Sequence, residues 1–217
     1  GTFSRVFEVL HTAGKVPYAC KIMQPLQTYI QYTSDGKKEG DLLARLTAED
    51  ATGANGCLQL KEYFTVPDAK GETWYCLIME KLECSLFDFV QANQGAGFEV
   101  PVIQTMARQM LTTAHFLHAR GLTHTDIKHK NIQIRSADYF RVTNPEHFPK
   151  QVRTLWPGRA RGAAPEYRQL RDTTVKIIDY GNATHTDEPH AHPIHTKQFR
   201  APEVLLEYGE WNESSDL

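Results

Sequence analysis

The chain has few of the features that mark disulfide-bonded, metal-clustered or membrane-spanning proteins. It contains only four cysteines in 217 residues, and no two of them are spaced as CxxC. This usage favours free thiols in a reducing compartment over a disulfide framework. The longest apolar run, residues 74–79, is far below the roughly 18 to 20 residues that span a bilayer. No charged segment leading into an apolar one comes after Gly1, so no signal peptide is expected.

An excess of charge of either sign is also absent. Twenty-four Lys and Arg stand against 26 Asp and Glu, for a formal charge of -2. The overall charge therefore gives no reason to expect direct binding to nucleic acid or to a membrane. Hydrophobic residues make up 41% and charged residues 23% of the chain, which is close to the globular average and predicts a folded protein with a sizeable core.

The first 80 residues predict strands and one helix. Four segments have the alternation or apolar content of strands: residues 5–10, 16–22, 57–65 and 74–79. A helix is expected at residues 37–46, because Glu39, Leu42, Leu43 and Leu46 recur on one face. Gly40 weakens this helix by about 1 kcal/mol relative to alanine, so it needs tertiary packing to persist.

A longer helix is expected after the polar stretch at residues 91–97. Pro101 is placed to start it and Gly121 to end it. One apolar stripe should run along it, formed by Ile103, Met106, Met110, Ala114 and Leu117. We interpret the two methionines as ordinary core and not as a binding stripe.

Residues 135–174 read as a loop-like insertion with a basic character. This stretch contains four prolines, eight basic residues and four acidic ones. It is interpreted as a solvated excursion, the alternative being a docking surface for an acidic or phosphorylated partner.

The motif HxDxKxxN spans His124 to Asn131. Phosphoryl transfer to a hydroxyl needs a carboxylate to orient that hydroxyl, a cation near the migrating phosphate and an oxygen ligand for magnesium. Asp126, Lys128 and Asn131 supply these three groups in order. A surface loop of mixed charge could match the motif by chance, so its weight depends on the other motifs of the chain.

Two further motifs come later in the chain. Asp179, Tyr180 and Gly181 come after a buried-looking strand end and resemble a DFG element, whose carboxylate would chelate magnesium. The sequence then reads Ala201-Pro202-Glu203, matching APE. At the other end, Tyr18 to Lys21 resembles VAIK, with Glu39 on the next helix able to pair with Lys21.

These motifs appear in the order of a eukaryotic protein kinase. The segment LTHTDIKHKN, residues 122–131, is similar to the LTHTDLKPEN pattern of the LAMMER (Clk) family of the CMGC group, and residues 195–217 also resemble that family. The resemblance implies an α+β, two-lobed kinase fold with a β-rich N-lobe and a helical C-lobe. Residues 1–82 would form the N-lobe and hinge, and residues 83–217 a C-lobe carrying the insertion. The chain is expected to be a kinase domain that is incomplete at both ends, with its C-lobe truncated.

The resemblance also implies which residues bind nucleotide. They are the glycine-rich loop, the adenine roof, the gatekeeper, the hinge and the adenine floor: Gly1, Thr2, Phe3, Ser4, Val6, Ala19, Lys21, Met79, Glu80, Leu82, Gln133 and Asp179. The ordinary alternative for most of them is strand core and a simple connection. Catalysis would fall to Asp126, Lys128, Lys21, Glu39 and Thr196, with Asn131 and Asp179 holding magnesium.

The activity implied is transfer of the γ-phosphoryl group of ATP, with Mg²⁺, to Ser, Thr and, in dual-specificity members, Tyr. The partners implied are protein substrates, Arg/Ser-rich splicing factors among them, in the nucleus or cytoplasm. The alternatives are a catalytically weak pseudokinase, a nucleotide-binding scaffold and another CMGC kinase. A zinc site at His185, His190, His192 and His195 is disfavoured, because no cysteine or fixed spacing supports it.

Several positions depart from the family pattern. Ser4 stands at a glycine position, His129 and Lys130 replace Pro and Glu, and Gln133 replaces an apolar residue. A buried amide at Gln133 would cost about 1 to 3 kcal/mol without a hydrogen-bond partner.

Two more departures concern the activation segment. Thr125 replaces the arginine with which many kinases bind an activation-loop phosphate, so control by that route is not expected. Phe199 stands where the family has Tyr, which removes a phosphorylatable hydroxyl.

Overall fold

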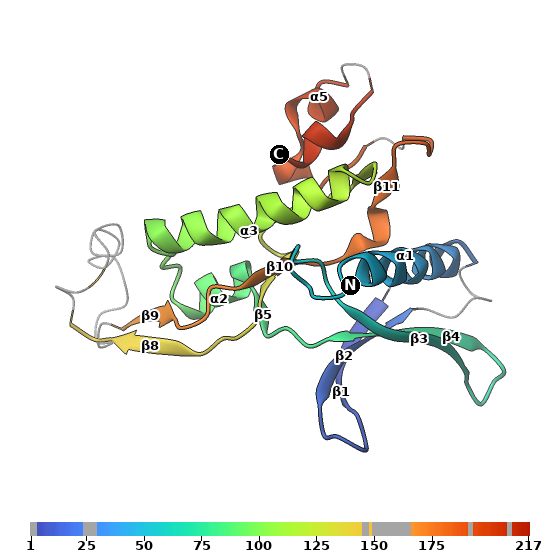
Figure 1. Cartoon of the computed structure of the whole chain (residues 1–217), viewed down its shortest axis with the longest axis horizontal. Coiled ribbons are helices and arrows are strands. Elements are labelled where there is room, and N and C mark those ends of the chain that lie inside the picture. The colour runs from blue at the N-terminus through green and yellow to red at the C-terminus, as the bar shows by residue number, and fades with distance from the viewer. Residues whose placement is uncertain (1–3, 24–29, 145–147, 149–165, 191–192, 208–209) are drawn as a thin grey trace.

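The computed structural model describes residues 4–23, 30–144, 148, 166–190, 193–207 and 210–217 (Figure 1). The chain forms an N-terminal part dominated by one sheet and a C-terminal part built around a long helix, α3 (Figure 1). Among the described residues, no helix combines the length and apolarity needed to cross a membrane.

The N-terminal sheet has four antiparallel strands. In chain order they are β1 (Ser4–Leu10), β2 (Pro17–Met23), β3 (Leu60–Pro67) and β4 (Thr73–Glu80), and in space they run β1-β2-β4-β3. Three of the predicted strands lie within two residues of these bounds. The third was expected from residue 57 to 65, but Cys57 instead forms a parallel bridge with Ile177, and the strand begins at Leu60. Just before this strand, the main-chain N–H of Gln59 donates a hydrogen bond to the Glu80 carboxylate at 2.8 Å.

Helix α1 (Ile30–Glu49) packs against this sheet and is twice as long as the predicted segment (Figure 1). Its predicted face is correct, since Glu39, Leu43 and Leu46 are buried. Gly40 proves to be a packing requirement. A Cβ atom there would lie 2.6 Å from the Tyr75 hydroxyl oxygen and 2.9 Å from Leu77 Cδ2, so glycine lets the helix approach β4.

Two helices open the C-terminal part. The short helix α2 (Leu86–Ala92), which the sequence analysis did not identify, is capped by Ser85, whose Oγ accepts from the Asp88 amide at 3.1 Å. Helix α3 (Val100–His118) matches the predicted long helix. Of its predicted stripe, Ile103 is wrong: it is 49% exposed, and Val102 packs against the core in its place.

The rest of the C-terminal part consists of loops joined by short strands. Strand β7 (Ile132–Ile134) lies between β10 (Val175–Ile177) and β5 (Cys84–Ser85), and β11 (Thr184–His185) pairs with β6 (Leu122–Thr123). The single helical turn η3 (Tyr180–Asn182) lies between β10 and β11. Two more turns, η4 (Lys197–Phe199) and η5 (Glu213–Asp216), come after β11, with the four-residue helix α5 (Pro202–Leu205) between them.

The insertion is more regular than predicted. Strands β8 (Tyr139–Val142) and β9 (Tyr167–Leu170) pair along their whole length as a hairpin that extends away from the sheet of the N-terminal part (Figure 1). Arg171 stacks 3.9 Å from the centre of the Phe140 ring, and Asn93 fixes Arg168 through its main-chain amide and carbonyl. Residues 149–165, including Pro149, lie outside the described residues.

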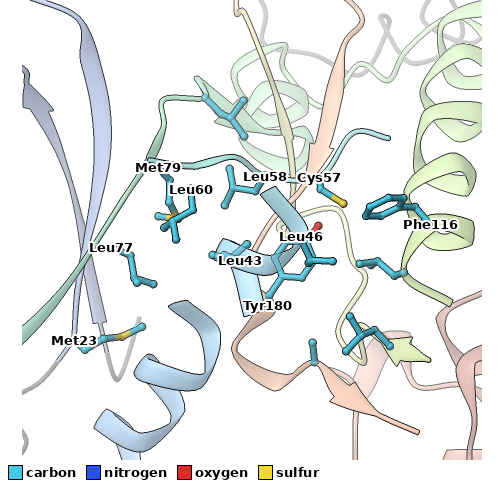
Figure 2. Packing of buried hydrophobic residues seen from close by; sticks show 14 of the residues in the cluster. Met23, Leu43, Leu46, Cys57, Leu58, Leu60, Leu77, Met79, Phe116 and Tyr180 are labelled. Carbon is cyan, nitrogen blue, oxygen red and sulfur yellow. The ribbon is translucent and has the colours of Figure 1, made fainter. Parts of the chain in front are cut away.

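One apolar cluster joins the two parts. It combines α1, β3, β4 and α3 with Tyr180, as Figure 2 shows for Leu43, Leu46, Leu77 and Phe116. The four cysteines are free thiols. Burial raises the pKa of Cys20 and of Cys57 to about 11, which keeps both uncharged at neutral pH.

Candidate active site

The junction of the two parts is held by charge. Lys21 on β2 donates from Nζ to both carboxylate oxygens of Glu39 on α1, at 2.8 and 2.7 Å, and to Asp179 Oδ1 at 2.9 Å. Burial alone would lower the pKa of Lys21, but these two carboxylates outweigh it and raise it. The same lysine holds the pKa of Asp179 below its usual value against the effect of desolvation. Lys21 is therefore a fixed cation between two carboxylates.

A second polar network surrounds Asp126 in the loop between β6 and β7. Lys128 Nζ donates to Asp126 Oδ2 at 2.6 Å and to the Thr196 hydroxyl at 2.7 Å. Thr196 in turn donates to Asp126 Oδ1 from its hydroxyl at 2.8 Å and from its amide at 3.1 Å. Thr196 comes from a segment 70 residues further along the chain, so the carboxylate of Asp126 is oriented from two sides.

Asn131 closes this loop. Its Nδ2 donates to the Asp126 main-chain oxygen at 3.0 Å and to Asp126 Oδ2 at 3.1 Å. These two bonds direct the amide nitrogen towards Asp126, and the side-chain oxygen of Asn131 accepts no hydrogen bond from the described residues. An amide oxygen here and the ionised, half-exposed Asp179 supply the hard oxygen donors that magnesium prefers.

His124 connects the loop to the segment around Asp179. Its Nδ1 accepts from the Asp126 amide at 3.3 Å, which makes Nε2 the protonated nitrogen that donates to the Ile178 carbonyl at 3.1 Å. Complete burial lowers the pKa of His124, so the ring is neutral near neutral pH. The ring also meets Tyr180 edge-on at 5.1 Å.

Asp216 supports the same loop and was not identified from the sequence. Its carboxylate accepts from the His124 amide at 2.8 Å, the Thr125 amide at 2.9 Å and His118 Nε2 at 2.9 Å. Burial would raise the pKa of Asp216, but these hydrogen bonds lower it. No spacing motif links residue 216 to residues 118–125, so only the fold reveals the contact.

Thr125 adopts a conformation that β-branched residues rarely take. It is buried and has φ of 68°, at a cost of about 1 to 3 kcal/mol. Besides the bond to Asp216, its hydroxyl donates to the Asn182 carbonyl at 2.9 Å, and its carbonyl accepts from the His195 amide at 3.0 Å. Thr125 thus ties the Asp126 loop to both ends of the segment from 179 to 203.

The connection after β4 leaves several main-chain groups unused. The Glu80 amide donates to the Gln59 carbonyl and the Glu83 amide to the Ile134 carbonyl, whereas Lys81 and Leu82 between them make no main-chain hydrogen bond within the described chain. Leu82 can therefore bond a planar ligand edge. The Glu80 side chain does not face such a ligand, because its carboxylate accepts from Lys176 Nζ at 2.5 Å, and Lys176 also donates to the Cys57 carbonyl at 3.1 Å. Lys176 is a second residue that sequence reasoning missed.

The other residues expected around adenine lie on β1, β2, β4 and β7. Ala19 pairs with Met79 across β2 and β4, Val6 pairs with Lys21 across β1 and β2, and Met79 is buried in the cluster of Figure 2. Gln133 lies in the middle of β7 and is half-buried. Ser4 begins β1, and Gly1, Thr2 and Phe3 lie outside the described residues.

The segment between Asp179 and Glu203 is anchored to both parts. Glu188 accepts from Lys38 on α1 at 2.7 Å and from the His185 amide at 3.2 Å. His190 stacks on Trp211 at 4.2 Å. Within the described segments, no group of three or more His, Cys, Asp or Glu side chains is placed to hold a metal ion, and His192 lies outside them.

Comparison with known proteins accounts for this arrangement. The chain matches the protein kinase domain family over residues 1–217. It is 28% identical to serine/threonine-protein kinase AFC1 of Arabidopsis thaliana and 30% identical to dual specificity protein kinase CLK1 of Homo sapiens, each over 100% of this chain. The chain spans 43% of the first and 40% of the second, so it covers less than half the length of either relative.

A solved structure agrees. The crystal structure of the PF14_0431 kinase domain superimposes with a TM-score of 0.79 at 30% sequence identity, covering 100% of this chain and 57% of that one. The two parts described above are thus the β-rich and helical lobes of a truncated kinase fold. The chain belongs to the protein kinase family, and its relatives include the LAMMER (Clk) kinases.

Proposed function

We propose that this chain carries the catalytic site of an ATP- and magnesium-dependent protein kinase. The observation that supports this most strongly is that the Lys21, Glu39 and Asp179 network lies at the lobe junction together with a complete Asp126, Lys128 and Thr196 network. In this proposal the N-lobe and hinge end at residue 82, and the truncated C-lobe begins at residue 83.

The role of Asp126 is to orient the acceptor. Its two carboxylate oxygens are held by Thr196 and Lys128, so the group is aligned before a substrate arrives. Asp126 accepts the proton of the acceptor hydroxyl while the hydroxyl oxygen bonds to the γ-phosphorus and the bond to the ADP oxygen breaks. Lys128 stabilises the charge on the moving phosphoryl group.

The role of Lys21 is to hold the nucleotide phosphates. Glu39 fixes the Lys21 ammonium group through two hydrogen bonds of 2.8 and 2.7 Å. These bonds set the position of the ammonium group and leave it able to bind phosphate oxygens. Leu82 supplies a free main-chain group for the adenine edge, while Val6, Ala19, Met79 and Gln133 line the ring, with Ser4 and residues 1–3 towards the phosphates.

Asn131 and Asp179 would hold magnesium. Their free oxygens fit this ion by donor type and charge. Magnesium, when bound, neutralises charge that develops on the phosphate oxygens.

The substrate class and location follow from the LAMMER resemblance. We propose transfer to Ser and Thr, and to Tyr as the name of the dual specificity relative CLK1 suggests. Arg/Ser-rich splicing proteins are the proposed substrates, and the nucleus or cytoplasm is the proposed location. The motif LTHTDIKHKN, residues 122–131, supports this part of the proposal.

The test is phosphoryl transfer by the full-length protein that contains this sequence. With γ-labelled ATP and magnesium, we expect label in an Arg/Ser-rich protein and in a generic basic protein. Asp126→Asn and Asp179→Ala should each abolish incorporation while leaving the melting temperature within a few degrees. Nucleotide binding without any turnover would contradict the proposal and favour a nucleotide-binding scaffold.

A further inference from the structure

An unpaired cation stands in the loop between β6 and β7 that carries Asp126, which is the catalytic loop of the proposed function. Lys130, four residues after Asp126, occupies the place where the LAMMER pattern has glutamate, so the charge there is reversed. The residue is exposed. It makes no ion pair in the described part of the chain, and its Nζ lies 4.7 Å from the centre of the Phe87 ring on α2.

Lys130 lies over a small aromatic surface formed by Phe87, His129 and Phe199. The His129 ring lies 4.9 Å from Phe87 and 5.1 Å from Phe199, measured between ring centres. Phe199 is 43% exposed. Because these residues come from α2, the catalytic loop and η4, the surface bridges three elements beside Asp126. Apolar surface under a charge reduces its solvation and strengthens its electrostatic interactions.

A second cation, Lys197, is close in the chain to the same surface. Lys197 follows Thr196, which donates to Asp126, and lies two residues before Phe199. It is exposed and has no acidic partner among the described residues. The third cation, Arg200, is engaged by the carbonyls of Ile194 and His195. Among the described residues, Lys130 and Lys197 are therefore two exposed cations left available to a substrate at Asp126.

The neighbouring acids do not neutralise them. Asp88 accepts from the Ser85 hydroxyl at 2.6 Å at the start of α2, and it lies about 100° around the helix from Phe87. Glu203 is half-buried on α5 and forms no ion pair with either lysine. The carboxylate of Asp126 is shared between Lys128 and Thr196.

We infer that this kinase selects acceptor segments that carry an anionic group, a carboxylate or a phosphate, within about three residues of the hydroxyl. This inference rests on the proposed function. A peptide that places its hydroxyl at Asp126 brings the next two or three residues within about 7 to 10 Å of the site, a separation comparable to the screening length of about 8 Å at physiological salt. Within an Arg/Ser-rich substrate, the anion would be a phosphate already present on a neighbouring serine.

The test is a positional scan with the full-length protein. Serine peptides carry Asp, phosphoserine, Gln or Arg at each of the three positions on either side of the acceptor, and kcat/KM is measured for each peptide. At one or more positions, we expect Asp or phosphoserine to exceed Arg by about tenfold, as a reversal of one surface charge allows. A larger effect of phosphoserine than of Asp identifies phosphate as the group recognised, and equal effects identify any anion.

Charge reversal provides the control. Lys130→Glu should invert the preference towards Arg, and Lys197→Glu should weaken it. Lys61→Glu, which makes the same charge change at an exposed lysine on β3, should leave the preference unchanged. Transfer to all peptides with no charge preference, or the same change in Lys61→Glu as in Lys130→Glu, would overturn the inference. Transfer to no peptide would instead count against the proposed function.

Discussion

The two halves of the proposed catalytic site are held in different ways. Lys21, Glu39 and Asp179 come from β2, from α1 and from the residue before η3, so their contacts depend on how the two lobes and α1 sit together. Asp126 and its neighbours are held inside the C-lobe by Thr196, Asn131 and the buried Asp216. Movement of α1 can therefore break the contacts among Lys21, Glu39 and Asp179 while the contacts around Asp126 remain in place.

Substitutions in the C-lobe network around Asp126 should lower the free energy of unfolding more than substitutions at the lobe junction. The His124 amide donates to Asp216 Oδ2 and the Thr125 amide to Oδ1, so in Asp216→Asn an NH₂ group replaces the oxygen that accepts from one of them, and His118 loses its anionic partner. We expect the free energy of unfolding to fall by about 3 kcal/mol. Chemical denaturation of the variant measures this.

A matched control is Asp172→Asn. Asp172 accepts from the exposed Arg135 at 2.7 Å and from the Thr174 amide at 2.9 Å, and the change should cost about 1 kcal/mol. Equal losses in the two variants would show that Asp216 does not support the loop as described.

A substitution at the contact between α1 and Lys21 should lower catalytic activity more than it lowers the stability of the fold. Glu39→Gln keeps the side-chain shape but removes the charge that holds Lys21. Displacement of Lys21 by about an ångström should lower kcat/KM about a hundredfold. Steady-state kinetics on the full-length protein tests this, with Glu62→Gln on the exposed face of β3 as the control. Wild-type rates in Glu39→Gln would contradict the role of the pair.

Acid should weaken the C-lobe network through His124. Its pKa is lowered in the folded state, so on acidification below about pH 6.5 the unfolded chain binds a proton that the folded chain resists. Stability should therefore fall by about 1 kcal/mol between pH 7 and pH 5.5. His124→Asn should reduce this slope and the exposed His11→Asn should not, as unfolding titrations at several pH values will show. An unchanged slope in His124→Asn would refute the assignment.

The smallest expected effect concerns Tyr180. Its hydroxyl is buried and makes no hydrogen bond of good geometry among the described residues, although the Cys57 thiol and the Leu58 main chain are its neighbours, and burial raises the pKa of Tyr180 well above its usual value. Tyr180→Phe should raise the free energy of unfolding by about 1 kcal/mol. Tyr167→Phe removes a hydroxyl that donates to the Gly97 carbonyl and should lower it by a similar amount. Destabilisation of both variants would show that Tyr180 has a partner.

The sequence predicted the order of the motifs and the secondary-structure type of most of the N-lobe, because strand alternation and catalytic spacing are local properties. It did not reveal the extent of α1, whose first residues have no apolar period, or the β8 and β9 hairpin, whose strands are separated by 24 residues. Contacts between distant residues were also invisible. Asp216 reaches His124 across 92 residues and Lys176 reaches Glu80 across 96.

Hydrogen exchange in the Glu39→Gln variant tests the central comparison most directly. The amides of His124 and Thr125, which donate to Asp216, report on the C-lobe network, and those of α1 report on the lobe junction. We predict that exchange accelerates in α1 while the two loop amides keep their protection. Equal loss of protection in both places would contradict the account, because the two halves of the site would then form one cooperative unit.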